Sequence, residues 1–106
     1  AHNERPLVFT HLSHIYTDGA SVYTTFLFRR APDPEAALAA WRAAKQAVSR
    51  TIVESGGTIS HQHGVGLDHA PYLRAEKSAA GLSLLGAVCR ALDPDGMLNP
   101  GKLLPS

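Results

Sequence analysis

The chain has 106 residues, 44% of them hydrophobic and 18% charged, which suits one modest globular domain. Its net charge of +1 indicates neither a basic surface that would bind nucleic acid nor a polybasic patch that would bind a membrane. No apolar run approaches the roughly 20 residues that a transmembrane helix needs. The single cysteine, Cys89, cannot form an internal disulfide and lies in an apolar pattern that favours packing. We expect a cytoplasmic protein, with peripheral membrane association as an alternative.

Two segments near the start of the chain have the composition of β-strands. Residues 7–15 (LVFTHLSHI) and 20–28 (ASVYTTFLF) are rich in β-branched and aromatic residues, and an Asp-Gly turn signal at 18–19 separates them. They predict an antiparallel hairpin. Side chains alternate between the faces of a strand, and the phenylalanine-bearing face of the second segment is the better core candidate. Tyr23 then lies on the opposite face, where its phenol could meet a ligand.

A long helix is predicted from Asp33 to the Gly-Gly pair at 56–57. Asp33 can cap the helix and Pro34 suits its first position. Glycine readily takes the left-handed conformation that ends a helix. Apolar residues at helical spacing predict a core-facing stripe that includes the single tryptophan. The stripe consists of Leu38, Trp41, Val48 and Ile52.

The second half of the chain predicts a short strand, a helix and a turn-rich tail. Residues 58–60 are expected to form the strand, and residues 72–92 a helix in two pieces, because Gly81 and Gly86 weaken it. Turns are expected at 93–96 and at 99–101. The order β-β-α-β-α predicts an α+β fold with helices on one face of a small antiparallel sheet.

The chain begins at Ala1 with no initiator methionine and enters an apolar segment almost at once. We therefore interpret residues 1–106 as a single domain that is a C-terminal piece of a longer protein. Residues 7–70 would hold a candidate active-site loop, and residues 71–106 the last helix and the tail.

The segment GGTISHQHGVG carries the strongest candidates for chemistry. In an extended chain His61 and His63 point to one side and Gln62 to the other, but a turn after His63 would let all three line one wall. The following glycines allow close approach of backbone and ligand. Imidazole gives and takes protons near neutral pH.

Three interpretations of this loop stay open on spacing alone. The first is a metal site in which His14 adds a third ligand, although Gln62 contributes only a neutral amide. The second is proton transfer and anion binding together with Tyr23. The third is a structural loop whose histidines cap backbone groups. The remaining histidines are expected to have no functional role. They are His2, His11 and His69.

Several motifs together resemble the C-terminal region of the FAD-linked oxidases of the vanillyl-alcohol-oxidase type. They are GGTISHQHGVGLD, the PYL that follows it, and ALDPDGMLNPGKLLP near the end. The upstream HLSHIYTDGASVYTTF is more similar to one branch, the alkyldihydroxyacetonephosphate synthases. The resemblance covers residues 12–104. It implies part of a ferredoxin-like cap domain, followed by the tail that returns to the flavin domain.

The resemblance also implies a cofactor and roles for particular residues. FAD would be bound mainly by an upstream domain, since this chain shows no glycine-rich pyrophosphate site. Tyr23 matches the active-site tyrosine of the branch and would share acid/base work with His63 at the flavin. Residues implied to bind substrate are His14, His61 and Gln62. Asn99 is implied to lie near the flavin. No metal is implied, because the metal-using hydroxyacid dehydrogenases carry glutamate where this chain has Gln62.

The resemblance points to more than one function. The synthase branch has three consecutive histidines, so Gln62 departs from it, and the closing Asn-Pro-Gly-Lys at 99–102 matches the hydroxyacid oxidases better. The leading hypothesis is alkyl transfer on acyl-dihydroxyacetone phosphate. The alternatives are an FAD-dependent dehydrogenase of D-2-hydroxy acids and a non-catalytic ferredoxin-like interaction module. The substrate would be a small phosphate ester or 2-hydroxy acid. The piece alone is expected to be inactive, and it could form a homodimer.

Overall fold

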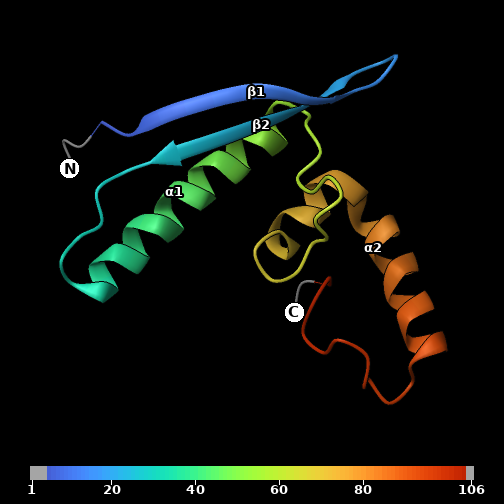
Figure 1. Cartoon of the computed structure of the whole chain (residues 1–106). Helices are drawn as coiled ribbons and strands as arrows, with labels where there is room; N and C mark the ends of the chain where they lie inside the picture. Colours follow the sequence, from blue (N-terminus) through green and yellow to red (C-terminus); the bar gives the residue numbers. More distant parts are fainter. Residues whose placement is uncertain (1–4, 105–106) are drawn as a thin grey trace. The chain divides into compact units, whose positions relative to one another are not determined.

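The computed structural model describes residues 5–104, so His2 lies outside the described residues. Its elements, in chain order, are β1 (Leu7–Ile15), β2 (Ala20–Leu27), α1 (Pro34–Glu54), the 3-10 helix η1 (Ala70–Tyr72) and α2 (Leu73–Leu92) (Figure 1). An antiparallel two-stranded sheet with two helices confirms the predicted α+β class. The chain divides into two compact units, with the boundary after Arg42, inside α1. The ferredoxin-like arrangement and the division at residue 70 stay predictions.

The predicted hairpin is confirmed. Strand β1 pairs antiparallel with β2 from Leu7 opposite Leu27 to Ser13 opposite Ser21. The Tyr16 N–H donates to the Gly19 carbonyl at 2.8 Å and closes the connecting turn. The strands therefore form where β-branched and aromatic residues flank an Asp-Gly turn, as the sequence pattern indicated.

A β-bulge interrupts the hairpin at His14. The register shifts between Ser13 and Ile15, which leaves His14 as the extra residue of β1. Its φ of 49° lies in the left-handed region, which is uncommon for a residue with a β-carbon. Bulges re-aim side chains and occur often beside active sites. One of the candidate site residues thus occupies an unusual backbone position.

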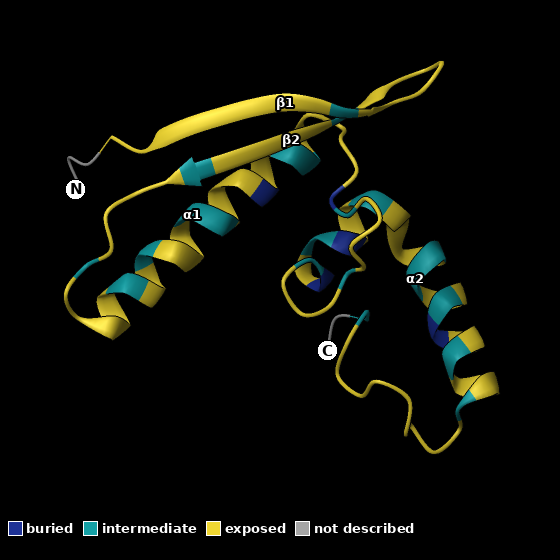
Figure 2. Cartoon of the chain, in the orientation of Figure 1, coloured by how far each residue is buried: buried dark blue, intermediate teal, exposed yellow. Residues whose placement is uncertain are grey.

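The two faces of the hairpin separate as predicted, but the expected core does not form within the described residues. Tyr23 shares a face with His11, while Phe26 lies on the other face opposite Val8. Phe26 is half-buried, yet Val22 on the same face is 63% exposed. Figure 2 shows that exposed positions predominate along both strands. A two-stranded ribbon buries little on its own, because a core needs a second apolar layer.

Helix α1 begins and ends at the predicted signals. The Asp33 carboxylate accepts the Ala36 N–H at 2.8 Å, so Asp33 is the N-cap. At the other end Gly56 has a φ of 74°, and the Gly57 N–H donates to the Ile52 carbonyl at 2.9 Å. Together with the bond from the Gly56 N–H to Val53 at 3.0 Å, this makes a Schellman motif.

Of the four residues in the predicted core stripe of α1, Ile52 is half-buried and the other three are exposed. Leu38, Trp41 and Val48 remain between 38% and 40% exposed. Their spacing gives the helix an apolar side, but burial also requires facing apolar side chains. Among residues 5–104, the buried hydrophobic residues lie elsewhere. They are Ile59, Ala70 and Leu73.

Helix α2 has the predicted two pieces, although the cause differs from the prediction. The break lies at Ser78 (φ 63°, ψ 170°) and not at a glycine. The Ser78 hydroxyl accepts the Gly81 N–H at 3.4 Å and so caps the second piece. Gly86 is buried: a β-carbon there would lie 3.2 Å from Nη1 of Arg90 and 3.8 Å from Cδ1 of Leu104.

The tail begins with the predicted turn at 93–96. The Gly96 N–H donates to the Asp93 carbonyl at 3.2 Å. The Asp93 carboxylate then accepts the N–H groups of Met97 and Leu98 at 3.0 and 2.7 Å. None of the helices in residues 5–104 has the length and apolar character to cross a membrane.

The strand predicted at 58–60 is not formed, and this part of the prediction is wrong. The segment is irregular. The Ile59 N–H, which a strand partner would have accepted, donates instead to the side chain of Glu76 at 2.9 Å. A side-chain acceptor has replaced the ladder bond that the sequence pattern assumed.

Candidate active-site loop and tyrosine

The loop that carries the two candidate histidines is closed by a bond across its base. The Ser60 hydroxyl donates to the Gly64 carbonyl. Between them lie His61, Gln62 and His63, and all three are exposed. The chain is bent and not extended here, because Gln62 has a φ of 68° and Gly64 a φ of 74°. The backbone therefore turns within the loop, and the turn begins one residue before His63.

Gln62 has a left-handed backbone conformation, which is uncommon for a residue with a β-carbon. Glycine takes positive φ freely, whereas a residue with a β-carbon pays an energetic cost. Residues held in such regions cluster at active sites and ligand clamps. Among the candidate site residues, Gln62 shares this property with His14 and with Asn99, whose φ is 48°.

Hydrogen bonds from His69 and from the tail hold the glycine segment that follows the histidines. The His69 ring Nδ1 lies 3.4 Å from the Gly64 carbonyl, which it can reach as a donor, and the His69 N–H donates to Val65 at 3.2 Å. The Leu103 N–H from the tail donates to the Gly66 carbonyl at 3.3 Å. His69 and the tail therefore both contact the backbone of this segment.

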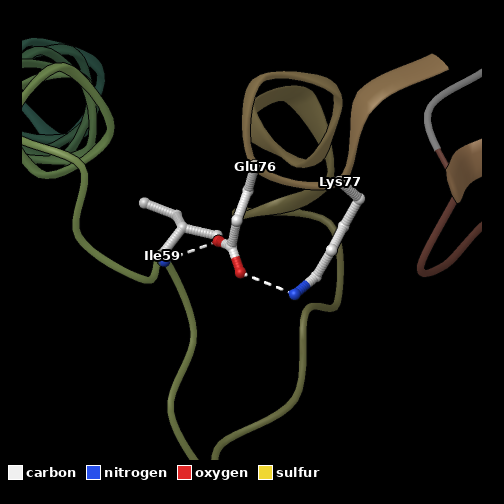
Figure 3. A network of polar contacts seen from close by, with 3 residues as sticks. All are labelled: Ile59, Glu76 and Lys77. Carbon is white, nitrogen blue, oxygen red and sulfur yellow. Dashed lines mark hydrogen bonds and ion pairs between the residues drawn. The ribbon is translucent and has the colours of Figure 1, made fainter. Parts of the chain in front are cut away.

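Glu76 anchors the residue that leads into the loop, and the sequence analysis missed it. One carboxylate oxygen accepts the Ile59 N–H at 2.9 Å, and the other pairs with the Lys77 ammonium at 2.8 Å (Figure 3). The Glu76 side chain is 15% exposed. Burial alone would raise the pKa of Glu76, but the bonds from Lys77 and Ile59 and the Lys77 charge lower it below its ordinary value. The only sequence signal was an acidic residue in the first turn of a helix.

Tyr23 and His14 belong to the hairpin unit. The Tyr23 ring is 49% exposed and stacks on the ring of His11, with centroids 5.1 Å apart and planes at 28°. The Ser13 hydroxyl lies 2.9 Å from Nδ1 of His14. The loop histidines, Gln62 and Asn99 belong to the unit that begins at Ala43. The structure thus groups the candidates into a hairpin set and a loop set.

Metal-binding side chains do not converge in the part of the chain that the structure describes. No group of three histidine, cysteine, aspartate or glutamate side chains there could hold a metal ion. The described candidates are imidazoles, a phenol and amides, which donate and accept protons or hydrogen bonds. This donor set suits binding of substrate oxygens and proton transfer.

The described residues form an α+β fold with an exposed loop in which His61 and His63 flank a left-handed Gln62. Comparison with known proteins places the domain more closely. The chain belongs to the family of FAD linked oxidases, C-terminal domain, whose family model matches residues 1–103. The resemblance seen in the motifs is confirmed, and the members of this family are FAD-linked enzymes.

Curated relatives include members of two branches. The chain is 30% identical over 93% of its length to alkyldihydroxyacetonephosphate synthase of Dictyostelium discoideum, and 32% identical over 91% to that of Trypanosoma brucei brucei. It is 45% identical over 48% of its length to glycolate oxidase subunit GlcD of Bacillus subtilis. These matches cover 16%, 15% and 11% of the respective relatives, so the chain spans a small part of their length. No solved structure matches the chain significantly.

The tail has side chains whose chemistry fits a flavin. Met97 and Leu98 are 77% and 74% exposed, and Asn99 follows them at the start of the Asn-Pro-Gly turn. A flavin ring has flat apolar faces and polar edge atoms, which apolar side chains can cover and an amide can bond. The exposed side chains of Met97 and Leu98 and the amide of Asn99 therefore have a chemistry that fits such a ring.

Proposed function

We propose that this chain is the substrate-side part of an FAD-dependent enzyme of the alkyldihydroxyacetonephosphate synthase type, acting in alkyl transfer on acyl-dihydroxyacetone phosphate. The observation that carries the proposal is the exposed loop at 61–63, in which His61 and His63 flank the left-handed Gln62. The similarity to synthases over more than nine tenths of the chain supports it.

The residues of this chain would bind the substrate and move protons. Tyr23 and His63 act as acid/base groups, since a phenol and an imidazole can each give and accept a proton. His61 and Gln62 bind substrate oxygens as hydrogen-bond donors, and His14 on the bulge does the same. FAD, when bound, would supply the electron-accepting ring, and Asn99 would help to hold it.

A D-2-hydroxy-acid dehydrogenase that uses the same cofactor is the second candidate. The 45% identity to a glycolate oxidase subunit over about half of the chain favours it. The two reactions differ in electron balance: oxidation of a hydroxy acid consumes an electron acceptor, whereas the synthase exchange is redox-neutral overall. Incubating the full-length protein with acyl-dihydroxyacetone phosphate and a fatty alcohol, or with D-2-hydroxy acids and a reducible dye, separates them. Activity in neither assay contradicts both and favours a non-catalytic module.

Substitution of His63 tests the loop directly. In the full-length protein His63→Ala should lower turnover by about 10²-fold, the typical size of a proton-transfer contribution. Leu67→Ala is the matched control, because Leu67 is an exposed side chain close by that carries no proton chemistry. Turnover of His63→Ala equal to that of Leu67→Ala would remove His63 from the proposal.

A further inference from the structure

The stacked partner of Tyr23 has no role in the function proposed so far. His11 lies directly opposite Tyr23 in the register of the hairpin. Side chains directly opposite each other share a face of the sheet, and here the two rings stack at 5.1 Å with planes at 28°. This is the separation at which ring pairs interact favourably. Within the hairpin, the stack is the contact that the structure gives for the Tyr23 ring.

The other cross-strand side-chain bond given for the hairpin lies away from the Tyr23 ring. The neighbouring cross-strand bond joins the hydroxyls of Thr10 and Thr24 at 3.2 Å. That pair lies on the opposite face, because successive side chains of a strand alternate. Tyr23 is 49% exposed, and a half-exposed ring without a packed neighbour samples several rotamers. A stacked imidazole reduces that freedom.

We propose that His11 is a positioning residue for Tyr23, whose stacked imidazole holds the phenol ring, and hence its hydroxyl, in one orientation for proton transfer. The proposal rests on the function assigned above to Tyr23. It replaces the sequence-based expectation that His11 has no functional role. The effect should fall on turnover more than on substrate binding, because orientation of an acid/base group matters most in the transition state.

Three variants of the full-length protein separate stacking from other effects. His11→Ala removes the ring and should lower kcat by about 10-fold while KM changes by less than about 2-fold. His11→Phe keeps a stacking ring and should remain within about 3-fold of the wild-type kcat. Thr10→Ala is the matched control, since it removes a cross-strand contact of the same hairpin from the opposite face, and its kcat should stay unchanged. If His11→Phe lost as much kcat as His11→Ala, the stacking role would be overturned.

A second measurement reports the ring itself. With 3-fluorotyrosine at position 23, the fluorine resonance should shift and broaden on His11→Ala and stay unchanged on Thr10→Ala. Tyr23→Phe separates the two proposals. If Tyr23→Phe is inactive while His11→Ala turns over like the wild type, the positioning role alone is overturned. If Tyr23→Phe turns over normally, the assignment of Tyr23 falls and the role of His11 falls with it.

Discussion

The hairpin and the loop region are held by different kinds of contact. In the hairpin, backbone pairing between neighbouring strands provides the order, and most side chains stay exposed. In the loop region at residues 57–69, which contains neither helix nor strand, groups far apart in sequence provide links: the Glu76 side chain accepts the Ile59 N–H across 17 residues, and the Leu103 N–H of the tail donates to the Gly66 carbonyl. Many backbone hydrogen bonds therefore hold the hairpin together. The loop region depends on a few hydrogen bonds.

Because of this difference, single substitutions should damage the loop region more than the hairpin. Glu76→Ala should have the largest effect. It removes the acceptor of the Ile59 N–H beside a side chain that is only 6% exposed. A buried donor left without a partner costs about 1–3 kcal/mol. Hydrogen exchange of the Ile59 amide in the full-length protein should accelerate by about 10- to 100-fold.

Two control variants sharpen this test. Glu76→Gln keeps an acceptor oxygen and loses the charge, so its effect should be intermediate. Glu54→Ala removes an exposed carboxylate at the end of α1 and should change little. Equal exchange of the Ile59 amide in Glu76→Ala and in Glu54→Ala would mean that the anchor does not hold the loop.

The second prediction compares one glycine from each region. Neither Gly64 in the loop nor Gly19 in the hairpin turn has an atom within 4 Å of where a β-carbon would stand, so neither site is crowded. Only Gly64 has a left-handed φ, of 74°. Gly64→Ala should therefore destabilise by about 1–2 kcal/mol through backbone strain alone, whereas Gly19→Ala should be near neutral. Urea denaturation of the full-length protein and its variants measures both, and equal losses at the two sites would contradict the backbone assignment of the loop.

The same contrast explains what could be predicted from the sequence. The hairpin, the caps of α1 and its glycine ending follow from local signals, and each is confirmed: an Asp-Gly turn, Asp33 three residues before the N–H that it accepts, and Gly56 at the left-handed position. The prediction of a strand at 58–60 failed because the Ile59 N–H bonds to the Glu76 side chain and not to a neighbouring strand. No local sequence pattern identifies that acceptor. The predicted burial of the apolar sides of the hairpin and of α1 failed for another reason. Periodicity shows which side of an element is apolar, but it does not show what covers that side.

The candidate site shows the same limit. The sequence located the histidine loop and its turn, because glycines and histidines stand together in the chain. It did not indicate that Gln62 and His14 take left-handed conformations, because residues with a β-carbon adopt them only uncommonly. It also missed the stack of His11 on Tyr23, which depends on the register that the bulge at His14 and the turn together define. Roles for the candidate residues therefore rest on the tests above.

The smallest expected effect comes from pH and acts only on the loop region. The pKa of Glu76 is lowered in the folded protein from its ordinary value of 4.5. A carboxyl with a depressed folded pKa contributes stability above its unfolded pKa, and that contribution is lost as the pH falls through the folded pKa. Protection of the Ile59 amide should thus be constant from pH 7 to about 5 and weaken below about 4.5. In Glu76→Gln the protection should lack this step, and amides of the hairpin ladder should not follow it in either protein. Protection that instead declined as the pH rose from 5 to 7 would have the wrong sign for a bonded carboxylate and would assign the anchor to another group.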